Sequence, residues 1–152
     1  MGGVPRTGCG MGWSDQGFEF FEVKADEGLR AWGNSMGEAF INAARGMFDL
    51  IVDPQGLRPS QPCRVVVEAQ DREALLVAWL SELLYLFEVE GFLPVGYEVG
   101  KLSDQRLEAN LQGDILDLTR HSVKGLVKAA TYHSLKVSED GGKWQVQVVL
   151  DV

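Results

Sequence analysis

Residues 143–152 read KWQVQVVLDV and alternate between apolar and polar side chains up to the last residue. Successive side chains of a β-strand point to opposite faces, so one face of this strand carries Trp144, Val146, Val148, Leu150 and Val152. Asp151 points the other way. With Val152 as the chain terminus, two close carboxylates repel unless a cation or hydrogen-bond donors lie between them. Hard cations such as Ca²⁺ or Mg²⁺ bind such oxygens; a solvated acid at a strand end is the alternative.

The preceding segment is expected to pair with this strand. Asp140-Gly141-Gly142 is a hairpin signal that joins it to an apolar segment, residues 126–137. Counting back from the turn pairs residues whose numbers add up to about 280, which puts Lys128 near Val152 and beside Asp151. A functional role for Lys128 competes with a surface ion pair, worth about 1 kcal/mol or less.

Two helices are predicted from caps and apolar spacing. Ser35 and Glu38 form a capping box, and the helix that begins there ends before Pro54. Asp71 caps a second helix that ends at Gly91. Its most apolar part, residues 74–89, is too short and too acidic to cross a membrane, so it is predicted to be a core helix.

The remaining segments predict strands. A hairpin-like start is expected from an alternating segment at 17–23, a turn at 26–28 and a short strand at 29–32; further strands are expected at 63–69, 95–99 and 106–112. The economical architecture is α+β: a two-layer sandwich with two main helices on one side of a mostly antiparallel sheet.

Length and composition favour one globular domain. A chain of 152 residues with 45% hydrophobic residues buries a real core, and we expect one domain over residues 18–152. Residues 1–17 are rich in glycine and lack an apolar run, so they are predicted to be a flexible leader and not a signal peptide.

Charge and cysteine content limit the kinds of partner and metal site that the sequence predicts. The net charge of −8 opposes phosphate-driven nucleic-acid binding and favours a cation or a basic protein partner, and no segment indicates a membrane partner. Cys9 and Cys63 are far apart and form no CxxC group, so neither a disulfide framework nor a zinc site is indicated. A reducing, cytoplasmic location is the simplest expectation.

No arrangement of residues indicates independent catalysis. The sequence contains no GxSxG, HExxH, P-loop or GxGxxG motif, and we predict no catalytic residue. His121 and His133 lack metal-ligand spacing and are expected to be structural hydrogen-bonding residues. Asp26 lies in Ala25-Asp26-Glu27-Gly28, where aspartate is common in turns. That turn and the strand end at Asp151 could meet on one edge of the sheet.

At these positions the sequence resembles archease, the small acidic activator of the RNA-splicing ligase that joins RNA ends in tRNA splicing and RNA repair. The resemblance runs from about Phe18 to Val152, and its motifs occur in the family's order: residues 20–28, 32–33, 43–49, 128–133 and 150–152. The family's first motif usually reads Glu-His-Thr-Ala-Asp. Here Val23 and Lys24 replace the histidine and threonine, and Asp26 is retained.

The resemblance implies a fold, a metal site and a partner. It implies a strand-helix-strand-strand core with an inserted α+β unit, and a divalent-cation site, usually calcium, built from the two motif aspartates, here Asp26 and Asp151. The Val152 carboxylate could add a ligand. The motif lysine, here Lys128, matters for activation in similar proteins. Members help the ligase to form its guanylate intermediate and to turn over, and they do not join RNA themselves.

Two other classes of function compete with this interpretation. An acidic chaperone-like module would bind basic or unfolded clients without a metal. A metal-dependent hydrolase would use the same carboxylates, but no nucleophile or general base accompanies them in the sequence.

Overall fold

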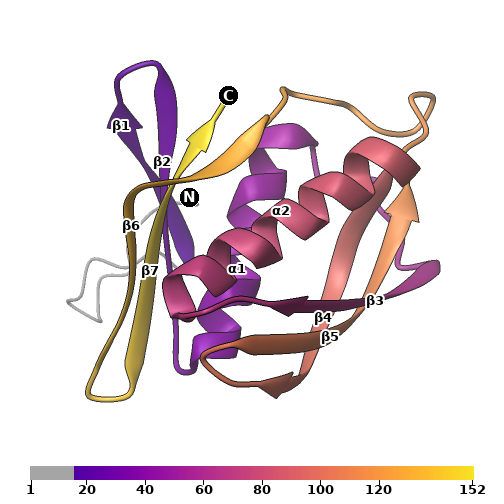
Figure 1. Ribbon diagram of the computed structural model, residues 1–152. Coiled ribbons are helices and arrows are strands. Elements are labelled where there is room, and N and C mark those ends of the chain that lie inside the picture. Colours follow the sequence, from indigo (N-terminus) through magenta and orange to yellow (C-terminus); the bar gives the residue numbers. More distant parts are fainter. Residues whose placement is uncertain (1–15) are drawn as a thin grey trace.

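The computed structural model describes residues 16–152, which form two β-sheets with two helices packed against them (Figure 1). In chain order the elements are β1 (Phe18–Val23), β2 (Asp26–Gly33), α1 (Met36–Ile51), β3 (Gln61–Glu68), α2 (Arg72–Glu90), β4 (Phe92–Leu102), β5 (Arg106–Ile115), β6 (Ala129–Asp140) and β7 (Lys143–Asp151).

The strands divide between two antiparallel sheets. One sheet has the order β1-β2-β7-β6, and the other has the order β3-β5-β4. The α+β class is therefore confirmed, with two main helices and a unit from β3 to β5 inserted between α1 and β6. The prediction of a single sheet is corrected, because the strands form two separate sheets. Alternation along a strand shows which side chains face a core, but strands with the same alternation can pair in one sheet or in two.

Helix α1 packs closely on the four-stranded sheet. Its N-cap is Ser35, whose Oγ accepts the Glu38 N–H at 3.1 Å, as the predicted capping box requires. The Glu38 carboxylate accepts the N–H of Asn34, the residue before the N-cap, in place of the N–H of Ser35. A Cβ atom at Gly46 would lie 2.6 Å from the Leu29 side chain of β2. The absence of a side chain at Gly46 thus permits the close approach of helix and strand.

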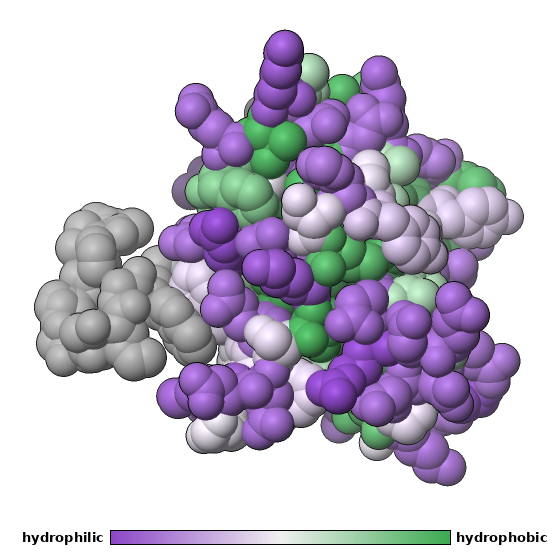
Figure 2. Space-filling model, turned by 60° about the vertical axis from the view of Figure 1, so that its left-hand side comes forward, coloured by the Kyte–Doolittle hydropathy of each residue, from purple (hydrophilic) through white to green (hydrophobic). Residues whose placement is uncertain are grey.

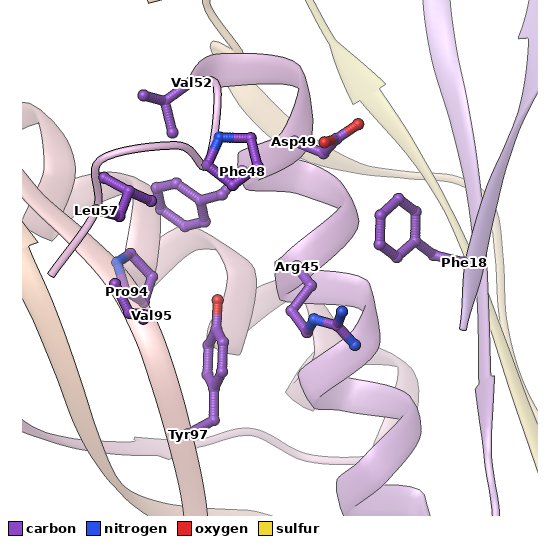
Figure 3. Close-up of a pocket in the computed structure, with 10 residues that line it drawn as sticks. Phe18, Arg45, Phe48, Asp49, Val52, Leu57, Pro94, Val95 and Tyr97 are labelled. Atoms are coloured by element: carbon purple, nitrogen blue, oxygen red, sulfur yellow. The ribbon is translucent and has the colours of Figure 1, made fainter. Parts of the chain in front are cut away.

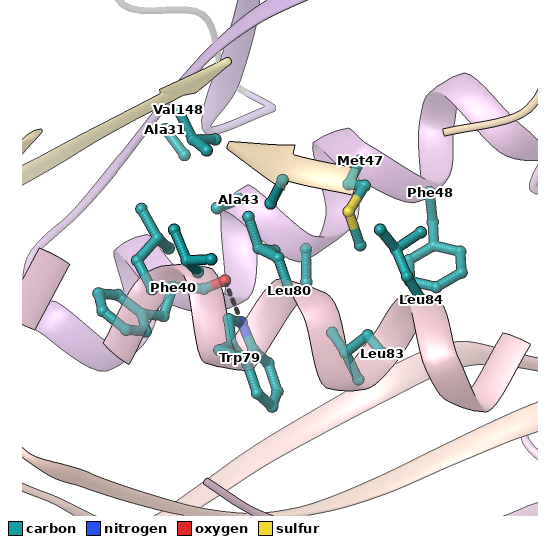
Figure 4. Close-up of a cluster of buried hydrophobic side chains, with 14 of the residues drawn as sticks. Ala31, Phe40, Ala43, Met47, Phe48, Trp79, Leu80, Leu83, Leu84 and Val148 are labelled. Atoms are coloured by element: carbon teal, nitrogen blue, oxygen red, sulfur yellow. Dashed lines mark hydrogen bonds between the residues drawn. The ribbon is translucent and has the colours of Figure 1, made fainter. Parts of the chain in front are cut away.

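Helix α2 is buried along most of its length. Asp71 caps its start, and Gly91 ends it in the left-handed conformation at φ 71°. Trp79 is fully buried, and its indole N–H donates to the carbonyl of Phe40 in α1 at 2.9 Å (Figure 4). This hydrogen bond joins the two helices inside the core. Within residues 16–152 no helix has the length and apolar character needed to cross a membrane.

The predicted leader falls almost entirely outside the described residues, as does Cys9. Of residues 1–17, only Gln16 and Gly17 are described. The Gly17 carbonyl accepts the Trp32 N–H at 3.0 Å. Cys63 is a free thiol whose pKa is raised by partial burial and by the nearby carboxylates of Glu90 and Glu82.

Replacing Trp79 by Phe should remove the buried hydrogen bond between the helices. We expect the free energy of unfolding to fall by about 1–3 kcal/mol, because the ring shrinks and the buried Phe40 carbonyl loses a donor. Urea unfolding followed by circular dichroism measures this change. Trp144→Phe, at a half-buried position, is the control and should cost less. Equal losses would show that the hydrogen bond contributes nothing.

Candidate functional site: the acidic rim

Asp26 is the first residue of β2, and Asp151 is the last residue of β7. These ends of two neighbouring strands lie at one rim of the four-stranded sheet (Figure 1). The last pair of β2 and β7 is Glu27 with Leu150, so the next position along both strands puts Asp26 opposite Asp151. Directly opposed residues of an antiparallel pair share a face, with Cβ atoms about 4.5–5.5 Å apart. We call these two residues the acidic rim.

The turn before Asp26 differs from the predicted one. The turn residues are Lys24 and Ala25, and Asp26 is the first residue of β2, paired with Val23. The predicted turn at 26–28 is therefore wrong. Ala25 takes the left-handed conformation, φ 66°, which costs a residue with a Cβ atom about 1–2 kcal/mol. This strained residue directly precedes Asp26, and the two-residue turn it completes starts β2 at the aspartate.

Lys128 lies next to Asp151, as predicted. Its backbone N–H donates to the Asp151 carbonyl at 2.7 Å, and the following residue, Ala129, pairs with Asp151. The Lys128 side chain is exposed. Within residues 16–152, no ion pair shorter than 4 Å involves Asp26, Asp151 or Lys128. The alternative of a surface ion pair between Lys128 and Asp151 is therefore not realised, and neither acid of the rim pairs with a cationic side chain of the described residues.

A bulge in β6 brings Lys128 to this position. Thr131 pairs with Val149 and Lys136 pairs with Gln147, so the intervening residues 132–135 lie opposite Val148 alone. A hairpin continued from its turn without this bulge would place Tyr132 opposite Asp151. Bulges often re-aim side chains near functional sites. Here the bulge shifts the register of β6 against β7 by several residues, so that Lys128, and not Tyr132, lies at Asp151.

Side chains on the outer face hold the bulge in place. Ser134 is left-handed at φ 53°, and its carbonyl accepts the Gln147 side-chain amide at 2.9 Å. Gln147 in turn accepts Arg30 Nε at 3.0 Å. Arg30 pairs with Glu19 at 3.3 Å and lies 4.2 Å from the centre of the Phe21 ring. These contacts cross all four strands, and nothing in the sequence pattern indicated them.

The connection before Lys128 is anchored by a buried carboxylate. Asp114 is 4% exposed and accepts hydrogen bonds from Arg120 Nη1 and Nη2, both at 3.2 Å, and from the backbone N–H groups of Arg58 at 3.0 Å and Ile115 at 2.8 Å. His121 Nε2 lies 3.1 Å from the same carboxylate. Since His121 Nδ1 accepts the Asp117 N–H, the Nε2 atom carries the proton toward Asp114.

The two predicted histidine roles have different outcomes. His121 is a structural hydrogen-bonding residue, as expected. The exposed side chain of His133 forms no hydrogen bond with residues 16–152, and only its backbone N–H donates, to Thr131 Oγ1 at 3.3 Å. The Asp114 cluster was not foreseen, because a single aspartate near a strand end carries no sequence signal of burial.

The acidic rim suits a hard cation only as part of a larger ligand set. Within residues 16–152, no three His, Cys, Asp or Glu side chains gather closely enough to hold a metal ion. Two aspartates supply at most four of the six to eight oxygens that Ca²⁺ binds. Their oxygens fit the chemistry of such an ion, and the remaining positions are open to other donors. The face of the molecule on the side of this sheet is mainly hydrophilic, with scattered hydrophobic patches (Figure 2).

The comparisons with known proteins give one family. Residues 18–152 match the model of the Archease protein family (MTH1598/TM1083). The chain belongs to the archease family. It is 39% identical to protein archease of Thermococcus gammatolerans over 139 residues, which cover 89% of this chain and 98% of that protein.

Two solved structures share the archease fold. The solution structure of Methanobacterium thermoautotrophicum protein 1598 superposes with a TM-score of 0.78 at 33% identity, covering 90% of this chain and 99% of that chain. The crystal structure of a Thermotoga maritima archease, described as a possible chaperone, superposes with a TM-score of 0.62 at 19% identity, covering 87% and 94%. The second likeness shows the fold alone.

Lowering the pH should unfold the protein through Asp114. The hydrogen bonds from Arg120 hold the pKa of Asp114 well below its usual range, against the opposing effect of burial, and the N–H groups of Arg58 and Ile115 and the His121 ring add to the lowering. A carboxyl whose pKa is lower in the folded state stabilises the fold above its unfolded pKa, about 3.9, and this stabilisation is lost as pH falls toward the folded value.

Asp114→Asn should therefore lower the free energy of unfolding at pH 7 by about 1–3 kcal/mol, because Arg120 and His121 lose a charged acceptor. It should also flatten the loss of stability below about pH 4. Thermal unfolding from pH 7 to pH 2 tests both effects. Asp104→Asn, at an exposed position, is the control. If Asp114→Asn lost stability below about pH 4 as steeply as the unmodified chain, Asp114 would not be the group that causes unfolding in acid.

Proposed function

We propose that this chain is a metal-binding accessory protein that activates a guanylate-dependent RNA-splicing ligase in tRNA splicing or RNA repair. The observation that carries the proposal is the strand register, which brings Asp26 beside Asp151 and joins the Lys128 backbone to Asp151 at 2.7 Å. These residues come from opposite ends of the chain. Membership of the archease family supports the same assignment.

The two carboxylates of the acidic rim favour the binding of a divalent cation, which we expect to be Ca²⁺. Like charges on directly opposed strand positions destabilise a sheet, and a bound cation would relieve that repulsion. Asp26 and Asp151 would hold the ion, with the α-carboxylate of Val152 as a further donor if the chain ends there. The ion, when bound, would present a positive charge and free ligand positions to the partner. A carboxylate or phosphate of the ligase could fill these positions.

Lys128 would act on the partner and not on the fold. Its ammonium is exposed and forms no ion pair within residues 16–152, so it is available to a phosphate or carboxylate of the ligase. The overall charge of −8 favours a protein partner with a positive cleft over RNA itself. The chain would then assist formation of the ligase guanylate intermediate and its turnover, in the cytoplasm, without joining RNA.

Asp151→Asn should lower both Ca²⁺ affinity and ligase activation by about tenfold or more, which corresponds to 1.4 kcal/mol or more. The substitution keeps the shape of the side chain and removes its charge, so the fold should persist. Calorimetric Ca²⁺ titration and multiple-turnover RNA ligation with a guanylate-dependent ligase measure the two effects. Asp140→Asn, an exposed acid at the turn end of the same hairpin, is the matched control.

The combination of effects separates the functional classes. Full activation by Asp151→Asn with lost Ca²⁺ binding would make the ion incidental. Activity that never depends on metal, with binding of unfolded clients, would instead identify the chaperone-like module. Turnover of RNA or nucleotide by the chain alone would identify a hydrolase.

Lys128→Ala should reduce multiple-turnover ligation while the melting temperature stays nearly constant. An exposed lysine without an ion pair contributes less than about 1 kcal/mol to folding. Lys136→Ala, at an exposed position of β6 beyond the bulge, should activate normally. Equal ligation rates for the two variants would remove Lys128 from the mechanism.

A further inference from the structure

A second site lies beside the C-terminal half of α1, away from the acidic rim. It is a cavity of about 210 Å³ whose apolar wall includes Phe48 of α1, Leu57 of the following loop and Pro94 of β4 (Figure 3). Phe18, at the first position of β1, lies at its edge. The rest of β1 separates Phe18 from Val23, the partner of Asp26, by about 17 Å at about 3.3 Å per residue.

The polar group inside this cavity is the hydroxyl of Tyr97. Figure 3 shows the hydroxyl pointing into the cavity. Tyr97 is half-buried, and no residue within 16–152 forms a hydrogen bond with its hydroxyl, which is therefore open to a ligand. Burial raises the pKa of Tyr97, and the nearby Arg45 charge opposes this effect only in part. The hydroxyl therefore stays protonated and can donate to an acceptor in the cavity.

Two residues of opposite charge, one helical turn apart on α1, also line the cavity. Arg45 and Asp49 have the spacing of an ion pair, yet they do not pair with each other. Toward residues 16–152, Arg45 donates hydrogen bonds through Nη1 alone, to Asn42 Oδ1 at 2.8 Å and to the Gln16 carbonyl at 3.4 Å. The Asp49 carboxylate lies 3.8 Å from Lys124 Nζ and accepts no hydrogen bond from residues 16–152. Both groups keep unused hydrogen-bonding capacity.

We propose that this cavity binds a small apolar α-amino acid. The carboxylate would accept hydrogen bonds from the Tyr97 hydroxyl and the Arg45 guanidinium, the ammonium would donate to Asp49, and the apolar side chain would lie against Phe48, Leu57 and Pro94. A simple anion would be repelled by the Asp49 carboxylate, and a simple cation would be repelled by the Arg45 guanidinium. A purely apolar ligand would leave the Tyr97 hydroxyl without a partner.

The size of the cavity agrees with this class of ligand. Its volume is about seven times the share of one water molecule in the liquid, about 30 Å³, and lies below the 300–1,000 Å³ typical of drug-sized ligands. A molecule with roughly seven to nine non-hydrogen atoms fits such a space, which includes valine and leucine.

The test is a titration of the full chain with leucine, followed by calorimetry and by amide chemical shifts. Two analogues probe the charges: leucinamide lacks the carboxylate, and 4-methylpentanoate lacks the ammonium. We expect saturable leucine binding that shifts the amide signals of Val95 and Tyr97 and leaves that of Asp151 unchanged. Both analogues should bind at least about tenfold more weakly, because each leaves a charged group of the site unpaired.

Variants locate the binding. Arg45→Gln should weaken leucine binding by about tenfold, and Tyr97→Phe, which keeps the ring, by about threefold to tenfold. Arg64→Gln, an exposed arginine on β3, should bind like the unmodified chain. Circular dichroism confirms that each variant folds. Absence of saturable leucine binding up to about 50 mM, equal binding of leucinamide, or unchanged binding by Arg45→Gln and Tyr97→Phe would overturn the proposal.

Discussion

The pairing of β2 with β7 is the constraint on which the rest of the structure depends. It joins the first part of the chain to its last strand, over pairs from Glu27 with Leu150 to Gly33 with Trp144. Leu29, Ala31 and Val148 are fully buried on the face that receives α1, and Gly46 lets the helix approach Leu29. Everything between α1 and β6, the whole three-stranded sheet and α2 included, is an insertion that this pairing must accommodate. The acidic rim exists because the two aspartates lie one position beyond the last pair of this register.

The rim illustrates how a fold can hold an arrangement that is unfavourable by itself. Asp26 and Asp151 are like charges on opposed positions, and the turn before Asp26 contains a left-handed alanine. Both features cost free energy. They persist because the buried strands below them fix the register. The bulge in β6 and its Gln147 and Arg30 contacts act in the same way on the other side, by setting where Lys128 meets Asp151.

The polar groups of residues 16–152 differ in how far the rest of the described chain satisfies their hydrogen-bonding capacity. Asp114 accepts hydrogen bonds from two side chains and two backbone groups, which is the pattern of a structural anchor. The acidic rim, Lys128 and the Tyr97 hydroxyl lack such partners within residues 16–152. Polar groups that a fold leaves unsatisfied are the natural candidates for contact with a ligand or a partner. This difference separates the groups that hold the structure together from those available for function.

The sequence by itself determined the helices and the final hairpin. Caps at Ser35 and Asp71, the stop at Gly91 and alternation in β7 are local, and local patterns depend on neighbours that the sequence shows. Only the tertiary structure decided that the strands form two sheets, that Asp26 begins a strand, that a bulge in β6 brings Lys128 beside Asp151, that Asp114 is buried and that Tyr97 lines a cavity. Those features depend on contacts between residues far apart in the chain, and alternation along one strand does not specify which strand lies beside it.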